Sequence, residues 1–125
     1  MNENDISYKI IGAALEVHKT LGPGLLESVY ENTLAYELRQ NGLETKAQVP
    51  LPVMYKEIKM EVGFRIDLLI ENKVIIEIKS VEALAPVHFA QTLTYLKLSG
   101  LKLALLINFN TIKLKDSIHR IVNKL

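Results

Sequence analysis

The chain contains no cysteine and no tryptophan, and its formal net charge is only +1 over 125 residues. The lack of cysteine excludes disulfides, thiolate zinc sites and iron–sulfur clusters, and fits a reducing compartment. A charge near zero gives no global argument for nucleic-acid binding, because dedicated non-specific binders usually carry a larger basic excess. No apolar run approaches the about 20 residues needed to cross a bilayer, and the polar start, Met1–Asp5, does not resemble a signal peptide. We therefore expect a cytoplasmic protein with no membrane partner.

Hydrophobic residues, in contrast, make up 49% of the chain, and no segment is of low complexity. At this length they can fill one core, so we expect residues 1–125 to form a single domain. Helical spacing of apolar residues predicts three helices, at about Ile6–Lys19, Leu25–Gln40 and Pro86–Ser99. The expected cap of the first helix is Asn4–Asp5.

The predicted buried positions of these helices repeat every three or four residues. They are Ile6, Ile10, Ala13, Ala14 and Val17 in the first helix, Val29, Leu34, Ala35 and Leu38 in the second, and Phe89, Leu93 and Leu96 in the third.

Extended segments fill most of the remaining chain. Two prolines place Thr45–Tyr55 at a sheet edge, and a second segment, Ile58–Val62, leads to a bulge or bend at Gly63. The apolar run Leu101–Asn108 follows a helix that follows a strand, which indicates a buried strand reached by a crossover. The tail, residues 111–125, is compatible with a strand or a short helix. The predicted fold is α+β, with a central mixed sheet of about 4–5 strands flanked by helices.

Charged residues interrupt the most apolar part of this sheet, a predicted hairpin with its reversal at Glu71–Lys73. Strand alternation puts Glu77 and Lys79 on one face, and Asp67 joins them if it pairs in register with Glu77, which a loop of three residues provides. We predict that register. Two acids and one base then converge, as a divalent cation and the water it activates require. A structural ion-pair network is the alternative interpretation of the same three residues.

Further motifs identify a family that this chain resembles. Gly24-Leu-Leu-Glu27-Ser-Val-Tyr30 has the form GxxExxY, Asp67 followed by Glu77-Ile78-Lys79 has the form D…ExK, and Gln91-Thr-Leu-Thr-Tyr95 has the form QxxxY. Together these motifs resemble the GxxExxY proteins of the PD-(D/E)XK nuclease superfamily, with the QxxxY helix of RecB-like nucleases. The resemblance covers nearly the whole chain and implies a restriction-endonuclease-like core.

The resemblance also implies a catalytic set. Glu27, Asp67, Glu77 and Lys79 would be the catalytic residues of a nuclease. Glu27, Asp67, Glu77 and the Ile78 carbonyl would hold Mg²⁺ or Mn²⁺. Taken alone, Glu27 is equally well explained by the helix dipole or by exposure at a helix start.

Four other residues are expected around these acids, as substrate contacts or as partners that orient the ligands. Tyr30 lies three residues after Glu27 on one helix face, and Gln91 and Tyr95 lie one helical turn apart. Arg65 would share a face with Asp67 and meet a phosphate, or form an ion pair with Glu77 or Glu27.

His18 has two interpretations: a metal-site histidine, as in some related nucleases, or a histidine favoured by the dipole at a helix C-terminus.

The predicted function is divalent-metal-dependent hydrolysis of phosphodiester bonds in nucleic acid, with DNA preferred over RNA and a homodimer as the expected assembly. The alternative is a catalytically silent nucleic-acid-binding or protein-interaction module with the nuclease fold. Cation binding that requires Asp67 separates the two.

Overall fold

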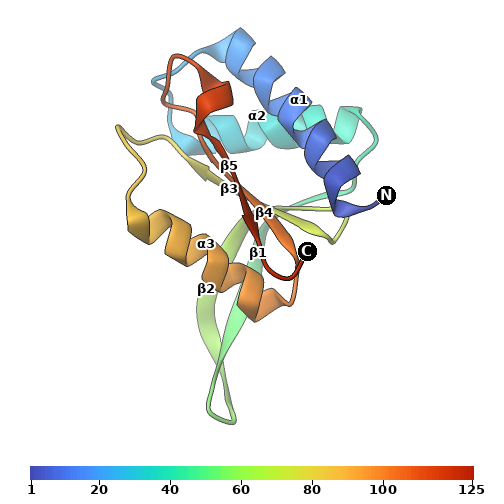
Figure 1. The fold of residues 1–125 in the computed structure, drawn as a ribbon, viewed down its shortest axis with the longest axis vertical. Helices are drawn as coiled ribbons and strands as arrows, with labels where there is room; N and C mark the ends of the chain where they lie inside the picture. Colours follow the sequence, from blue (N-terminus) through green and yellow to red (C-terminus); the bar gives the residue numbers. More distant parts are fainter.

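A computed structural model describes residues 1–125, apart from the side chain of Val62. In chain order its elements are α1 (Glu3–Leu21), α2 (Glu27–Gln40), β1 (Thr45–Tyr55), β2 (Ile58–Ile70), β3 (Val74–Lys79), α3 (Pro86–Ser99), β4 (Leu103–Asn108), a 3₁₀ turn η1 (Leu114–Ser117) and β5 (Ile118–Val122) (Figure 1). None of the described helices is long and apolar enough to span a membrane.

The strands form one mixed sheet of five strands in the order β1-β2-β3-β4-β5. Only β3 and β4 are parallel, and α3 connects them; every other neighbouring pair is antiparallel. The α+β class, the mixed sheet, the edge position of β1 and the crossover to a buried β4 are therefore confirmed. In the tail, Ile118–Val122 forms the second edge strand, and the short-helix alternative for these residues is not observed.

Helices α1 and α2 cover one face of the sheet and α3 covers the other (Figure 1). The five predicted core residues of α1 are all buried. In α2, Leu34, Ala35 and Leu38 are buried as predicted, but Val29 is 38% exposed and Tyr30 is fully buried in its place. The reason is that the ring of Tyr30 stacks on Phe109, with ring centroids 4.6 Å apart, which turns Val29 outwards.

Helix α3 has the predicted bounds and ends where Gly100 adopts a left-handed conformation. Its buried residues are Thr92, Tyr95 and Leu96, whereas Phe89 and Leu93, predicted as core, are only half-buried. The helix thus turns a partly polar face to the sheet. Hydropathy alone does not predict this orientation, since the Thr92 hydroxyl is satisfied within the helix by donating to the His88 carbonyl oxygen.

Two helix starts differ from the prediction. Helix α1 begins at Glu3 and not at Ile6, because the side chain of Asn2 accepts a hydrogen bond from the Asp5 backbone N–H at 2.8 Å and caps the helix there. Helix α2 begins at Glu27 and not at Leu25, because residues 22–26 form a turn in which Gly22 and Gly24 have positive φ.

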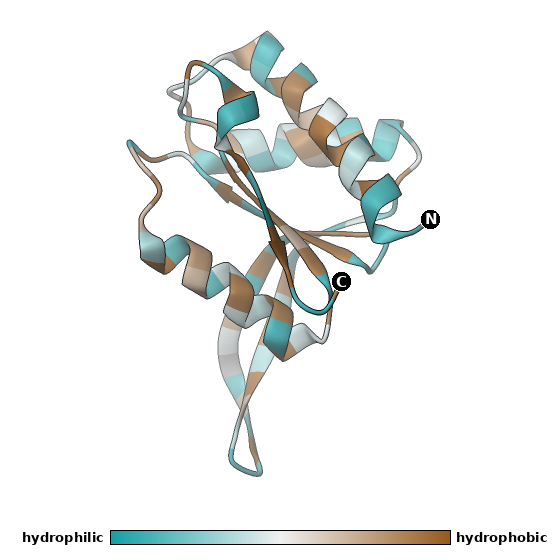
Figure 2. Cartoon of the chain, in the orientation of Figure 1, coloured by the Kyte–Doolittle hydropathy of each residue, from teal (hydrophilic) through white to brown (hydrophobic). Residues whose placement is uncertain are grey.

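The hairpin β1–β2 extends well beyond the rest of the sheet (Figure 1). Its second strand is continuous over Ile58–Ile70, so Gly63 does not separate two segments. The register shifts between Leu51↔Phe64 and Val53↔Met60, where residues 61–63 of β2 lie opposite the single residue Pro52 of β1, so the bulge expected at Gly63 is present. Gly63 is required because a Cβ atom there would collide with the backbone of Leu51. Hydrophobic residues concentrate on the inner parts of the sheet, and the turn at the tip of this hairpin, Lys56–Glu57, is hydrophilic (Figure 2), although Met54, Tyr55 and Ile58 beside it are exposed.

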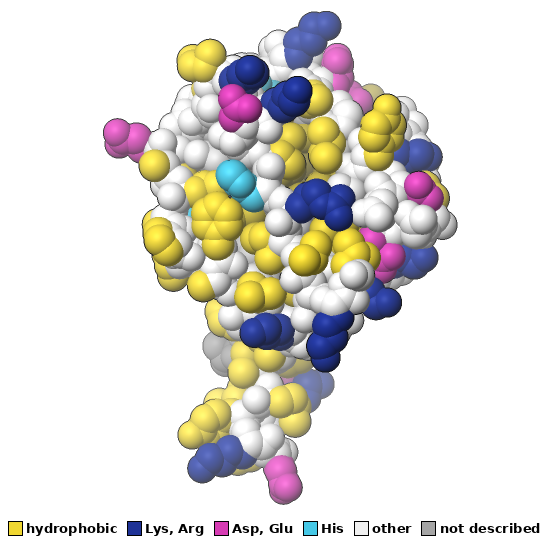
Figure 3. Space-filling model, viewed as in Figure 1, with side chains coloured by type: hydrophobic (Ala, Val, Ile, Leu, Met, Phe, Trp, Pro, Cys, Tyr) yellow, Lys and Arg dark blue, Asp and Glu magenta, His cyan; other side chains and the backbone are white. Residues whose placement is uncertain are grey.

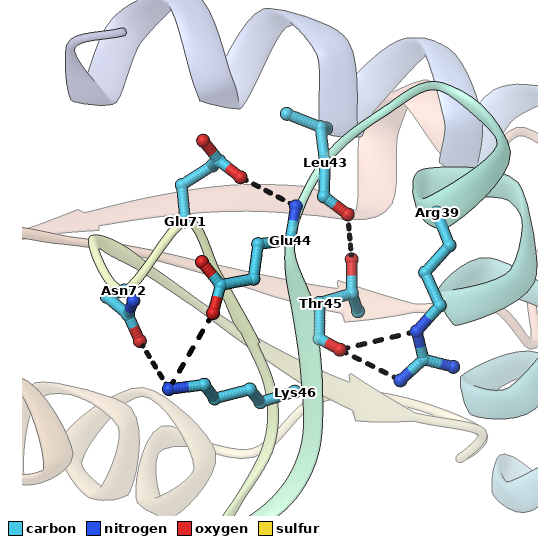
Figure 4. Close-up of polar contacts among 7 residues, drawn as sticks. All are labelled: Arg39, Leu43, Glu44, Thr45, Lys46, Glu71 and Asn72. Carbon is cyan, nitrogen blue, oxygen red and sulfur yellow. Dashed lines mark hydrogen bonds and ion pairs between the residues drawn. The ribbon is translucent and has the colours of Figure 1, made fainter.

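The turn between β2 and β3 has the predicted three residues, 71–73, and two of them, Glu71 and Asn72, have φ near +55°. Around it, Glu71 accepts a hydrogen bond from the Glu44 backbone N–H, and Lys46 donates to Asn72 and lies 3.8 Å from Glu44 (Figure 4). These polar contacts are exposed, and they fix the turn end of the hairpin to the start of β1.

Candidate active site

At the opposite end of the hairpin, β2 and β3 lose their regular pairing. The ladder runs from Ile70↔Val74 to Leu68↔Ile76. In the next positions, the Asp67 backbone N–H donates to Glu77 Oε2 at 2.9 Å, and the Ile78 N–H donates to Asp67 Oδ2 at 2.8 Å. Two side-chain carboxylates therefore replace the ladder bonds, which places Asp67 opposite Glu77 in the predicted register. We call this region, with Asp67, Glu77 and Lys79, the carboxylate end.

Glu77 is only 5% exposed. Burial, and then the negative charge of Asp67, raise its pKa from 4.5 to about 9, against smaller lowering effects of the Asp67 N–H and Lys79. Among the described residues, neither carboxylate is paired with Lys or Arg within 4.0 Å. Without a cation Glu77 therefore keeps its proton at neutral pH, and no close Lys or Arg in the described part of the chain pairs with either acid, so the alternative of a structural ion-pair network is not what the side chains form.

Lys79 lies two residues after Glu77 and pairs across the ladder with Asn108 of β4. The buried side chain of Asn108 accepts a hydrogen bond from the Val81 N–H and donates to the Val81 carbonyl oxygen. Asn108 therefore fixes the chain that leaves β3 directly after Lys79. The sequence did not indicate this contact, which joins residues 27 positions apart.

Tyr95 of α3 belongs to the same region. It is 5% exposed, and burial, then the negative charges of Glu77 and Asp67, raise its pKa to about 12. Its ring packs against Phe64, with centroids 4.8 Å apart. The hydroxyl remains protonated at neutral pH and can donate a hydrogen bond. Gln91 lies one turn earlier on α3 and is half-buried.

Helix α2 reaches the carboxylate end from the other face of the sheet. Its start is held there because the Ser80 hydroxyl donates to the Leu25 carbonyl oxygen at 2.6 Å. Glu27 is the first residue of α2 and is exposed. One turn later, Glu31 is half-buried, and its pKa is raised by burial, then by Asp67, and to a smaller extent by Glu27.

Glu31 was not among the predicted site residues. Asp67 raises the pKa of Glu31 more than Glu27 does, so Glu31 interacts more strongly with Asp67 than with its neighbour on the helix. The i, i+4 spacing to Glu27 on one helix face was the available signal.

Three other predicted residues lie apart from the carboxylates. The Tyr30 hydroxyl donates to the Gly22 carbonyl oxygen at 2.6 Å and accepts from the Leu25 N–H at 3.2 Å, so it supports the turn before α2. His18 is in the last turn of α1, and its Nε2 lies 2.8 Å from the Thr111 carbonyl oxygen. Arg65 is exposed and lines a surface hollow with Pro50, Glu61, Gly63 and Phe64.

The expected alternation that would bring Arg65 to Asp67 is interrupted. Ile66 packs in the core cluster under α3, whereas Leu68, two residues later, packs in the cluster under α1 and α2. Strand β2 therefore turns about its own axis at Asp67. Among the described residues, Arg65 forms no ion pair within 4.0 Å with Glu77 or Glu27.

The donor set suits a hard divalent cation. No group of three or more His, Asp or Glu side chains among the described residues is arranged to hold one ion. Mg²⁺, however, is typically bound by one or two carboxylates and keeps several waters. Asp67 and Glu77 provide two carboxylates, and burial makes their joint ionisation costly without a cation. The residues present therefore fit Mg²⁺ or Mn²⁺.

Comparison with known proteins agrees with this geometry. A family model described as the PD-(D/E)XK nuclease superfamily matches residues 4–121. Neither the curated proteins nor the solved structures gave a match. Because the family model spans nearly the whole chain, including both strands of the carboxylate end and helices α2 and α3, this protein belongs to the PD-(D/E)XK nuclease superfamily.

Proposed function

We propose that this protein is a divalent-cation-dependent nuclease that hydrolyses phosphodiester bonds in DNA. The observation that carries the proposal is the Asp67–Glu77 pair, in which Glu77 is buried and Asp67 half-buried, and which replaces two ladder bonds at the end of the hairpin. Maintaining such a pair costs stability, and a group whose pKa is strongly shifted by burial and a like charge is typical of functional sites. Membership of the nuclease superfamily gives the reaction class.

In the proposed site, Asp67 and Glu77 hold Mg²⁺ or Mn²⁺, with the Ile78 carbonyl as a further ligand and Glu27 contributing from α2. When bound, the cation lowers the pKa of a water and offsets charge that develops on the phosphate. The buried position of Glu77 keeps bulk water away from one side of the pair, which strengthens its attraction for the cation.

Lys79 is near enough for its charge to lower the pKa of Glu77, although it forms no ion pair within 4.0 Å with any residue that the structure describes, and Asn108 fixes the chain that follows it. We propose that its ammonium group orients the attacking water or contacts the phosphate. Tyr95 remains protonated and can donate a hydrogen bond to a ligand or to substrate, and we propose that Gln91, one turn away, contacts the phosphate or supports the ligands.

Positive charge does not form one broad patch on the face drawn in Figure 3. On the face formed by α3 and β5, lysines and arginines are spread between hydrophobic side chains (Figure 3). We propose that binding relies on contacts close to the scissile phosphate and on a homodimer that doubles the contact surface. This predicts weak binding that falls with added salt.

The test is a cleavage assay on single- and double-stranded DNA and RNA with Mg²⁺ or Mn²⁺, comparing wild type with Lys79→Ala and with Lys73→Ala as a matched control at the turn end. We expect cation-dependent cleavage of DNA that falls by about 10²–10³-fold in Lys79→Ala, as when a transition-state donor is removed. Lys73→Ala should cleave like wild type. Equal cleavage by Lys79→Ala and wild type would contradict the proposal, since it would show a contaminating nuclease.

A further inference from the structure

Gln48 has an unusual backbone for a strand residue. Its φ is +52°, in the left-handed region that residues other than glycine rarely adopt. The ladder between β1 and β2 keeps one register on both sides, with Ala47↔Leu68 and Val49↔Ile66, but omits the pair in between. That omitted pair is Gln48 with Asp67. The strain therefore occurs directly opposite one of the two proposed ligands, and strain of this kind persists only where the surrounding structure imposes it.

The strained residue makes a specific contact. Gln48 Nε2 donates to Glu31 Oε1 at 2.7 Å, which joins β1 to α2. A neutral amide holds the carboxylate without cancelling its charge, as a lysine or arginine would. Glu31 is half-buried and lies one turn after Glu27 on the helix that faces the carboxylate end. The contact therefore keeps an additional negative charge near Asp67.

We propose that Gln48 and Glu31 are positioning residues of the cation site: the Gln48 amide orients Glu31, and the charge of Glu31 increases the affinity of the Asp67–Glu77 pair for a divalent cation. This inference rests on the proposed function. It deepens that function by adding a fourth carboxylate, outside the family motifs, that acts through the electrostatic field and through ordered water. The raised pKa of Glu31 supports it, because Asp67 is the largest charge effect on that group.

The experiment measures Mn²⁺ and Mg²⁺ binding to the full chain by calorimetry, without substrate and at physiological salt, which limits effects of distant charges. Glu31→Gln removes the charge but can still accept the Gln48 hydrogen bond. Glu37→Gln, at another half-buried glutamate of α2, removes the same charge away from the site and is the matched control. Partners that orient ligands typically change metal affinity 10–100-fold, so we expect about tenfold weaker binding in Glu31→Gln and no change in Glu37→Gln.

A second variant tests whether Gln48 orients Glu31 or only stabilises the fold. Gln48→Gly removes the amide and also relieves the positive φ, since glycine adopts it without strain. We expect weaker cation binding, by a few-fold to about tenfold, with an unchanged or higher melting temperature. A merely structural bridge between α2 and β1 predicts the opposite pattern, with a lower melting temperature and unchanged cation affinity, and that result would overturn the inference.

The outcomes also separate this inference from the proposed function. If wild type binds the cation, Asp67→Asn does not, and Glu31→Gln binds as tightly as Glu37→Gln, the positioning inference fails and the proposed nuclease site remains. If wild type binds no divalent cation at millimolar concentration, both fail.

Discussion

The two ends of the β2–β3 hairpin carry similar residues in opposite environments. At the turn end, Glu44 and Lys46 are exposed and Glu71 is half-buried, and each makes a hydrogen bond or ion pair (Figure 4). At the carboxylate end, Asp67 and Glu77 lie against each other, Glu77 is buried, and Lys79 is not within 4.0 Å of either. The same strands thus support one solvated charge network and one pair of adjacent acids, of which Glu77 is buried, without a close cation among the described residues.

The difference indicates that the turn end supports the fold, whereas the carboxylate end does not. The turn end closes the hairpin with contacts that cost little, because every group stays partly in water. The carboxylate end lacks regular ladder bonds and holds a buried acid, Glu77, against a half-buried one, Asp67, which destabilises the folded chain in the absence of a cation. A feature that costs stability in an otherwise consistent sheet is expected at a functional site, and this end also receives residues from α2 and α3.

The first test asks whether Tyr30 supports the fold or belongs to the cation site. Tyr30 belongs to the GxxExxY motif, but its hydroxyl makes both of its hydrogen bonds to the turn before α2. Tyr30→Phe should therefore lower the free energy of unfolding by about 1–3 kcal/mol, because buried backbone groups lose their partner. Denaturant unfolding measures this loss. Cation affinity should remain that of wild type, and a specific loss of affinity with unchanged stability would place Tyr30 in the site instead.

The second test predicts a gain in stability, not a loss. Glu77→Gln should stabilise the cation-free protein at pH 7 by about 1 kcal/mol, roughly 3–6 °C in melting temperature. In wild type, the folded pKa of Glu77 is about 9 and its ordinary value is 4.5. Stability therefore rises as the pH falls from 9 towards 4.5, and the advantage of the variant should shrink over that range.

Glu71→Gln is the matched control for this variant, since Glu71 is an acid of the same hairpin at the exposed turn end. We expect no gain in its melting temperature. Equal gains in Glu71→Gln and Glu77→Gln would mean that the two ends do not differ in the cost of their charges.

The smallest effect is expected from Lys46→Ala, at the exposed network of the turn end. Its ion pair with Glu44 is more than half exposed on both sides, and such pairs contribute about 0.2–1 kcal/mol. Thermal unfolding should detect a loss of stability within that range, and the loss should be smaller at high salt. A loss above about 2 kcal/mol would show that the turn end, and not only the core, determines hairpin stability.

Sequence reasoning predicted the hairpin register because two independent constraints agree. A three-residue turn fixes the pairing, and the alternation of Ile76 and Ile78 with Glu77 and Lys79 fixes the faces. The helix bounds of α3 were likewise predictable, since Pro86 and Gly100 mark both ends. These are local signals, and they gave the fold class and the central position of the carboxylates.

Contacts between distant segments were not predictable from one sequence. The rotation of β2 at Asp67 separates Arg65 from the face that alternation assigns to it. Gln48 reaches Glu31 across 17 positions through a positive φ that no glycine signals. Tyr30 turns inward because Phe109, from the far end of the chain, supplies its stacking partner. Each depends on tertiary packing and not on spacing.

The most direct measurement is a crystal structure of the protein soaked with Mn²⁺, with anomalous scattering to locate the ion. The account predicts a Mn²⁺ peak between the carboxylates of Asp67 and Glu77, within ligand distance of both, and no such peak in Asp67→Asn. An ion bound at the Glu71–Lys46 end instead, or wild-type crystals with no ion at the carboxylate pair at millimolar Mn²⁺, would contradict it.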